Sequence, residues 1–179
     1  SEESTVAPFL LRARREGLRD FGACLSPMNA FQILQGIETL PVRMQRHVAN
    51  AERIAHFLAE HPMVSSVAYP GLASHPDHAL AQRLLPRGCG AVFSFNLKGD
   101  RAAGQRFVQA LRLFSHLANV GDARSLVIHP ASTTHFRMDS AALASAGIGE
   151  GTLRLSIGLE DADDLIADLK TAFRAAERG

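Results

Sequence analysis

Thr152-Leu153-Arg154-Leu155-Ser156-Ile157 alternates apolar and polar side chains without interruption. Because successive side chains of a β-strand point to opposite faces of a sheet, the three apolar residues line one face, and Arg154 and Ser156 line the other. This stretch predicts a strand that is buried on one face and carries an arginine on the opposite face.

Outward from this strand, strand patterns and helix patterns interleave. A final helix is predicted from about residue 161 to 178, because four apolar residues recur at helical spacing: Leu165, Leu169, Phe173 and Ala176. Further strands are predicted over 64–69, 91–97, 115–120 and 126–129, and helices over 78–85 and from Asp100 to Leu111. Such interleaving indicates an α/β sheet with helices on one face and the other face uncovered by this chain.

The first third of the chain is helical in pattern. Residues 1–21 predict a short helix with little core of its own, and Ser26-Pro27 is a good helix start. The helix that follows carries an apolar stripe and should end or bend at Pro41; the stripe comprises Met28, Phe31, Leu34 and Ile37. A longer helix is predicted over 42–61, with Met44, Val48, Ala51, Ala55 and Leu58 on its buried side.

Composition excludes several classes of protein. The net charge is +1 with acids and bases interspersed, which argues against a nucleic-acid or lipid-surface partner. Neither a membrane span nor a signal peptide is apparent, so a cytoplasmic location is expected. Cys24 and Cys89 are expected to be reduced thiols. The chain opens with Ser1, so we expect it to be truncated or cleaved.

Arg154 and Ser125 are the candidates for ligand binding. The planar fork of Arg154 matches a carboxylate, although spacing alone favours an ordinary solvated strand arginine. Ser125 precedes the apolar strand 126–128, where its hydroxyl and backbone N–H can be presented at a strand end. Because Gly-x-Ser-x-Gly does not surround it, Ser125 is not predicted to be a nucleophile.

The remaining polar motifs predict no catalytic residue and no metal site. The eight histidines include neither His-Glu-x-x-His nor a Cys/His cluster, so they are interpreted as loop or capping residues. Gly88-Cys89-Gly90 precedes a strand and opens no helix, so it is interpreted as a turn. Glu160 and Asp161 stand where the last helix needs a cap and are taken as structural.

Two runs, 119–135 (Asn-Val-Gly-Asp-Ala-Arg-Ser-Leu-Val-Ile-His-Pro-Ala-Ser-Thr-Thr-His) and 154–161 (Arg-Leu-Ser-Ile-Gly-Leu-Glu-Asp), resemble the C-terminal part of the pyridoxal-phosphate enzymes of sulfur amino-acid (Cys/Met) metabolism. Shorter matches in the same order are Leu25-Ser26-Pro27, 36–40, 69–72, 74–76 and 93–95. The resemblance implies the aspartate-aminotransferase-like type I fold and a homo-oligomer. Residues 1–41 would be the end of the large cofactor domain, and 42–61 would form a helix that connects the two domains. Residues 62–179 would form the small α/β domain with a mostly antiparallel sheet.

The resemblance also implies an activity. Arg154 and Ser125 match the residues that bind the substrate α-carboxylate, and 133–135 match a loop at the site rim. The cofactor would be pyridoxal 5'-phosphate, whose Schiff-base lysine is absent here because Lys98 and Lys170 lie in unrelated contexts. The forms of 119–122 and 129–135 look most like the O-acetylhomoserine sulfhydrylases, which convert O-acetylhomoserine and sulfide to homocysteine and acetate.

The missing N-terminal cofactor domain is therefore an expected partner, and the chain alone is predicted to be inactive. O-succinylhomoserine sulfhydrylase and methionine γ-lyase remain alternatives within the family. A non-catalytic assembly or interaction module is the alternative from another class.

Overall fold

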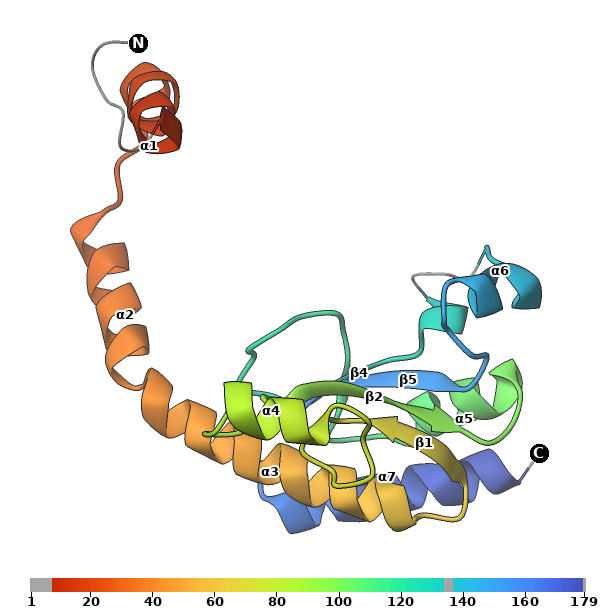
Figure 1. Ribbon diagram of the computed structural model, residues 1–179. Coiled ribbons are helices and arrows are strands. Elements are labelled where there is room, and N and C mark those ends of the chain that lie inside the picture. Colours follow the sequence, from red (N-terminus) through yellow and green to blue (C-terminus); the bar gives the residue numbers. More distant parts are fainter. Residues whose placement is uncertain (1–7, 134–136, 179) are drawn as a thin grey trace. The chain divides into compact units, whose positions relative to one another are not determined.

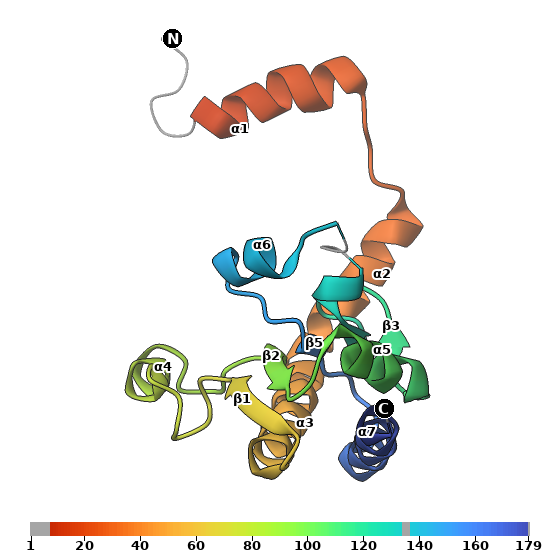
Figure 2. The ribbon, with the colours of Figure 1, turned by 90° about the vertical axis from the view of Figure 1, so that its right-hand side faces the viewer.

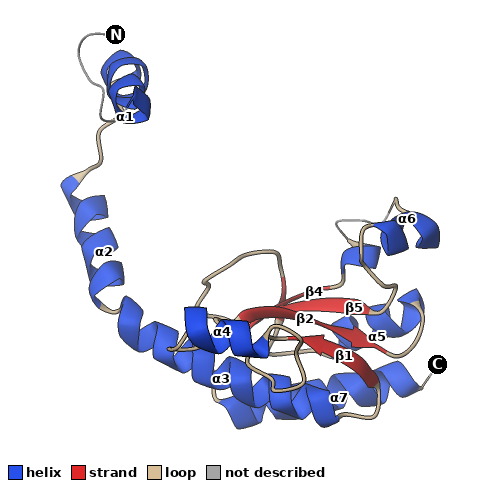
Figure 3. Cartoon of the chain, in the orientation of Figure 1, coloured by secondary structure: helices blue, strands red, loops and turns tan. Residues whose placement is uncertain are grey.

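The computed structural model describes residues 8–133 and 137–178 of the protein (Figure 1). It divides into two compact units, Ser1–Pro41 and Val42–Gly179. The described helices are α1 (Pro8–Arg12), the π-helix η1 (Ala13–Arg19), α2 (Pro27–Glu38), α3 (Leu40–Glu60), α4 (His78–Leu84), α5 (Arg101–Ala110), the 3-10 helix η2 (Pro130–Ser132), α6 (Ser140–Ser145) and α7 (Ala162–Glu177). The strands, red in Figure 3, are β1 (Val64–Ala68), β2 (Val92–Leu97), β3 (Ser115–His116), β4 (Leu126–Ile128) and β5 (Thr152–Ser156).

The first unit consists of helices whose described residues are not buried. Ser26 caps α2 as predicted, because its side chain accepts a hydrogen bond from the Asn29 N–H at 3.2 Å. The apolar stripe of α2 is real in spacing but remains exposed within this unit; its members are Met28 (64%), Phe31 (58%), Leu34 (57%) and Ile37 (58%). The helix break falls at Thr39 and not at Pro41, since proline is compatible with the first turn of α3.

The second unit is built on one sheet with the strand order β1-β2-β5-β4-β3. Pairing is antiparallel between β1 and β2, β2 and β5, and β5 and β4, whereas β3 and β4 are parallel. The sheet is thus mostly antiparallel, as expected. The strand predicted over 115–120 is limited to Ser115–His116, and the helix α6 was not predicted.

Helices α3 and α7 cover one face of this sheet. In Figures 1 and 2, α3 and α7 lie on the same side of the strands, while α6 lies on the other side. The predicted connecting helix, residues 42–61, belongs to the same compact unit as residues 62–179. The predicted stripe of α3 is partly wrong: Met44 is exposed, and the buried face instead includes Ile54, His47 and Asn50.

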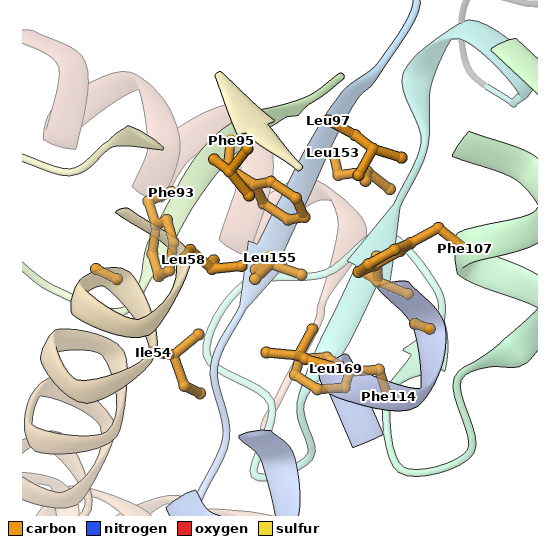
Figure 4. Close-up of a cluster of buried hydrophobic side chains, with 14 of the residues drawn as sticks. Ile54, Leu58, Phe93, Phe95, Leu97, Phe107, Phe114, Leu153, Leu155 and Leu169 are labelled. Atoms are coloured by element: carbon orange, nitrogen blue, oxygen red, sulfur yellow. The ribbon is translucent and has the colours of Figure 1, made fainter. Parts of the chain in front are cut away.

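Aromatic and aliphatic side chains fill the space between the sheet and these helices (Figure 4). Leu153 and Leu155 of β5 are fully buried there, together with Leu165 and Leu169 of α7. Phe107 of α5 lies edge-on to Phe173 of α7, with ring centroids 4.9 Å apart, a favourable geometry for aromatic pairs. The face of β5 that holds Leu153 and Leu155 is consequently a rigid base for the residues on its other face.

None of the helices within 8–133 and 137–178 combines the length and apolar character needed to cross a lipid bilayer. Both cysteines of the sequence are described, and both are free thiols. Cys24 is exposed and Cys89 is half-buried.

Candidate carboxylate-binding site

Arg154 lies at the centre of the sheet, on the face opposite the helix-covered core. Its strand β5 is hydrogen-bonded on both sides, and Arg154 pairs with Ser94 of β2 and with Ile128 of β4. Its neighbours Leu153 and Leu155 are fully buried, whereas Arg154 itself is half-buried. The alternation predicted from the sequence is therefore confirmed, and the backbone of this arginine is held from both edges.

A small pocket surrounds the Arg154 side chain. It is lined by the segment 117–119, by Leu126 and Ile128 of β4, and by Ser156 of β5. The Nη2 atom of Arg154 donates to the carbonyl oxygen of Asn119 over 3.4 Å. Asn119 was not predicted as a site residue, although it opens the motif Asn119-Val120-Gly121-Asp122 that the sequence singles out.

Arg154 has no carboxylate partner among residues 8–133 and 137–178; the ion pairs described there involve other arginines. A half-buried guanidinium that keeps most of its N–H donors available can bind an anion in a planar, two-pronged contact. The Arg154 guanidinium is therefore chemically suited to bind a carboxylate.

Ser125 occupies a different environment from the one predicted. Its side chain is fully buried, and its hydroxyl donates to Glu160 Oε2 at 2.9 Å. Its backbone N–H donates to Glu160 Oε1 at 2.7 Å, and the Gly158 N–H donates to its hydroxyl oxygen at 2.8 Å. The hydroxyl and the backbone N–H that the sequence places at the strand end are thus both bonded to Glu160. Direct binding of a substrate by Ser125 stays a prediction.

Glu160 has a structural role, as does Asp161, which caps α7 by accepting from the Asp163 N–H at 2.9 Å. The partner of Glu160 differs from the expectation, however, because its carboxylate binds Ser125, 35 residues earlier in the chain, and not the start of α7.

Two buried polar residues of α3 hold the chain just after β5. His47 contacts the Ile157 carbonyl through Nδ1 at 2.6 Å, and Asn50 Nδ2 donates to the carbonyls of Gly158 at 3.0 Å and Glu160 at 2.8 Å. Because the Ile157 carbonyl can only accept, His47 Nδ1 carries the proton. Sequence reasoning missed both residues because polar side chains on the buried face of a helix break the apolar stripe.

His129, four residues before the predicted rim segment 133–135, is fully buried, and both of its ring nitrogens are hydrogen-bonded. Nε2 donates to the Glu150 carbonyl at 2.7 Å, so Nδ1 is the acceptor facing the Ser132 hydroxyl at 2.8 Å. Burial lowers the pKa of His129, and the Glu150 carbonyl partly opposes this shift. Of the predicted rim residues, Thr133 bonds the His129 carbonyl at 2.9 Å, whereas Thr134 and His135 lie outside the described residues.

Neither lysine of the sequence is placed for covalent cofactor chemistry. Lys98 Nζ donates to the Pro62 carbonyl at 2.7 Å, and Lys170 Nζ lies 5.8 Å from the centre of the Phe57 ring. Neither residue lines the pocket beside Arg154. The lysines therefore do not fit a Schiff base with pyridoxal phosphate, whereas Arg154 fits the binding of a substrate carboxylate.

Comparison with known proteins identifies relatives along nearly the whole chain. The family described as Cys/Met metabolism PLP-dependent enzyme matches residues 6–174. An O-acetyl-L-homoserine sulfhydrylase of Leptospira meyeri is 50% identical over 167 residues, which are 93% of this chain and 38% of that protein. An L-methionine gamma-lyase of Pseudomonas putida is 49% identical over 166 residues, 92% of this chain and 42% of that protein.

Among solved structures, a putative O-acetylhomoserine (thiol)-lyase of Campylobacter jejuni, which contains N'-pyridoxyl-lysine-5'-monophosphate, superposes with a TM-score of 0.81 at 47% identity. The match covers 92% of this chain and 39% of that one. The chain thus spans about two fifths of the length of these relatives.

Proposed function

The chain belongs to the Cys/Met metabolism PLP-dependent enzymes, and we propose that it supplies the substrate-carboxylate wall of a sulfhydrylase that converts O-acetylhomoserine and sulfide to homocysteine and acetate. One observation carries the proposal: Arg154 is half-buried on a central strand without a carboxylate partner in the described part of the chain. An amino-acid substrate brings that partner in its α-carboxylate. The acetyl ester and sulfide are the finer part of the proposal and rest on the names of the relatives.

The physical role of Arg154 in this proposal is binding and orientation. A guanidinium and a carboxylate form two parallel charge-assisted hydrogen bonds, which restrict rotation of the substrate as well as its position. The flanking strands hold the Arg154 backbone, and the Asn119 carbonyl occupies one guanidinium donor. Leu126 and Ile128 reduce the water around the pair and so strengthen it.

Pyridoxal 5'-phosphate is the cofactor of this family and, when bound, supplies the electron sink for chemistry at the amino-acid carbon atoms. We propose that the groups holding it come from a preceding cofactor domain, because Lys98 and Lys170 are committed to other contacts. The isolated chain should accordingly be inactive. Mixing the purified chain with pyridoxal phosphate and reducing with borohydride should leave no stable adduct and no sulfhydrylase turnover.

Substitution of Arg154 in the full-length enzyme tests the proposed binding role. Arg154→Ala should raise the KM for O-acetylhomoserine, because losing one member of a partly desolvated charge pair costs on the order of 2–5 kcal/mol. As a control, Arg53→Ala removes an arginine that pairs with Asp163 at the protein surface, and it should leave KM unchanged. An unaltered KM in Arg154→Ala would exclude the assigned role.

Two alternatives within the family share the same carboxylate contact. A methionine γ-lyase is supported by the 49% identical relative from Pseudomonas putida, and an O-succinylhomoserine sulfhydrylase would differ only in the leaving group. Steady-state rates with the acetyl and succinyl esters of homoserine plus sulfide, and with methionine alone, separate the three activities. A preference for the acetyl ester is expected, whereas equal rates with both esters would remove the basis for choosing it.

A non-catalytic assembly module is the alternative from another class, and the exposed apolar face of α2 favours it. Our proposal assigns that face instead to contact with the rest of a longer, homo-oligomeric enzyme. The intact mass of the natural gene product discriminates between them, because the enzyme requires a polypeptide more than twice as long as this chain. A natural product of this chain's length would support the module.

A further inference from the structure

The segment 158–160 after β5 is joined to the segment 123–125 before β4 by a compact set of hydrogen bonds, which we call the Glu160 latch. It comprises the two bonds from Ser125 to the Glu160 carboxylate at 2.7 and 2.9 Å and the bond from Gly158 N–H to the Ser125 hydroxyl at 2.8 Å. A backbone bond from Leu159 N–H to the Ala123 carbonyl at 2.9 Å completes it. The amide N–H and the hydroxyl group of Ser125 are therefore both hydrogen-bonded within the latch.

A carboxylate is the side chain that this arrangement requires. The Ser125 amide and hydroxyl both donate toward position 160, so position 160 must offer two acceptors in one plane. Glutamate does so with two equivalent oxygens, whereas glutamine offers one acceptor and one donor, and alanine offers neither. Bonds to a charged acceptor are also stronger than bonds between neutral groups.

The base of the latch is fixed to α3. The Glu160 carbonyl accepts from Asn50 at 2.8 Å and from Arg46 at 3.3 Å. Gly158 leaves no room for a side chain: a Cβ atom there would lie 2.5 Å from the Ala123 carbonyl oxygen and closer still to Glu160 Oε2. The two segments therefore meet in van der Waals contact, and the Glu160 side chain starts from a rigid backbone.

The latch closes the loop that borders the Arg154 pocket. This loop joins β3 to β4 and includes Asn119, whose carbonyl accepts from Arg154 Nη2. At its start, the loop follows β3, which is two residues long and pairs with β4, and the Asp168 carboxylate holds the backbone N–H groups of 112–114 just before it. At its end, the loop is held by Ser125 and Glu160. Loss of the Glu160 bonds would therefore release one of the two ends that keep Asn119 beside Arg154.

We propose that Glu160 is a positioning residue: through Ser125, it holds the loop 117–125 so that Asn119 and Arg154 keep the geometry that binds the substrate carboxylate. This inference rests on the proposed binding role of Arg154. It also assigns Ser125 an indirect function, in place of a direct contact with the substrate.

Kinetics of the full-length enzyme test the latch with Glu160→Ala, Glu160→Gln and a neighbouring control, Asp161→Ala. Glu160→Ala should raise the KM for O-acetylhomoserine about tenfold with kcat changed less than twofold, the effect expected when charge-assisted bonds that order a binding loop are lost. Glu160→Gln should give an intermediate KM, because its carbonyl oxygen still accepts from the Ser125 amide but its NH2 group cannot accept from the Ser125 hydroxyl. Asp161→Ala removes the α7 cap and the surface ion pair with Arg46 at 3.7 Å but leaves both bonds from Ser125 to Glu160, so it should lower stability without changing KM.

Hydrogen–deuterium exchange of the same variants provides a readout independent of turnover. Amides in 119–125 should exchange faster in Glu160→Ala than in the parent protein or Asp161→Ala, while those of β5 should be unchanged. If Glu160→Ala does not fold, Glu160→Gln carries the test, with an intermediate KM and an intermediate exchange rate expected. Unchanged KM in Glu160→Gln and Glu160→Ala, or an equal rise in Asp161→Ala, would overturn the proposal.

A double-mutant cycle separates the indirect role of Ser125 from direct substrate binding. If Ser125 acts only through the latch, Ser125→Ala and Glu160→Ala together should raise KM no more than the larger single effect. Multiplicative effects would mean that Ser125 contacts the substrate independently, and would overturn the assignment. Arg154→Ala distinguishes failure of the proposed function from failure of the latch. An unchanged KM in Arg154→Ala refutes the proposed function. A raised KM in Arg154→Ala together with an unchanged KM in Glu160→Ala refutes only the latch.

Discussion

Gly104→Ala is the substitution for which the structure makes the sharpest stability prediction. Gly104 lies inside α5, where alanine is normally favoured over glycine by about 1 kcal/mol. Its missing side chain makes room for the buried His129 ring. A Cβ atom at position 104 would lie 2.5 Å from His129 Nε2 and 2.7 Å from Cε1, well inside van der Waals contact.

The His129 ring cannot move away without breaking its hydrogen bonds. Nε2 is bonded to the Glu150 carbonyl at 2.7 Å and Nδ1 to the Ser132 hydroxyl at 2.8 Å, and the residue is fully buried. Overpacking of a core costs about 1–3 kcal/mol, and a buried polar group left unpaired costs about 1–3 kcal/mol. After the helix-propensity gain of about 1 kcal/mol is subtracted from these two costs, Gly104→Ala should lower the free energy of unfolding by about 1–5 kcal/mol.

Urea unfolding followed by circular dichroism at neutral pH measures this difference. The exposed neighbour Gln105 provides the control, because the difference between Gln105→Gly and Gln105→Ala reports the helix-propensity term on the same helix without touching His129. If Gly104→Ala were as stable as the parent or more stable, the ring would have to relocate without cost. The assigned packing of His129 against α5 would then be refuted.

Three further predictions concern the same unit. Burial holds the pKa of His129 below 6.5, so the unfolded chain binds a proton more readily than the folded chain. The contribution of His129 to the free energy of unfolding should therefore be fully present above about pH 6.5. It should decrease as the pH is lowered, by at most about 1.4 kcal/mol per pH unit. Urea midpoints between pH 7.5 and 5.5 should be less pH-dependent in His129→Asn, and an identical slope would contradict this. Asp168→Ala should lower the free energy of unfolding by about 2–4 kcal/mol, because the Asp168 carboxylate accepts from the backbone N–H groups of 112–114. Asp168→Asn should lower it less. A urea midpoint of Asp168→Ala equal to that of the parent protein would refute the structural role of Asp168. Leu155→Ala should cost about 3–4 kcal/mol because the side chain is fully buried at the centre of the core, and a loss below 1 kcal/mol by urea titration would contradict this packing.

Periodicity and capping residues were sufficient to predict most of the elements. Alternation in 152–157 predicted both the strand and the face on which Arg154 lies, because a strand leaves only two directions for a side chain. Ser26 was recognisable as a cap, since short polar side chains before a helix accept from its first free N–H groups, and Asp100 caps α5 in the same way. These features are local, so the sequence contains them in full.

The buried face of α3 was less predictable. An apolar pattern placed Met44 inward and overlooked Ile54, while the actual buried face includes His47 and Asn50. Those polar residues are buried because they bond backbone carbonyls after β5, a partner about 110 residues away that no helical spacing reveals. The α2 stripe shows the converse: its spacing is helical, yet its residues are exposed in the unit that contains them.

The sequence by itself determined the family, the interleaving of strands and helices, and the orientation of Arg154, because each follows from residue identity and short-range spacing. Only the tertiary structure decided that Asn119 lies beside Arg154 and that Ser125 faces Glu160. Those pairs join segments 35 residues apart, and a hydroxyl, an amide and a carboxylate can each form hydrogen bonds with many kinds of partner. Which partner is chosen depends on how the sheet brings the ends of β4 and β5 together, and there the Ser125 amide and hydroxyl meet the Glu160 carboxylate.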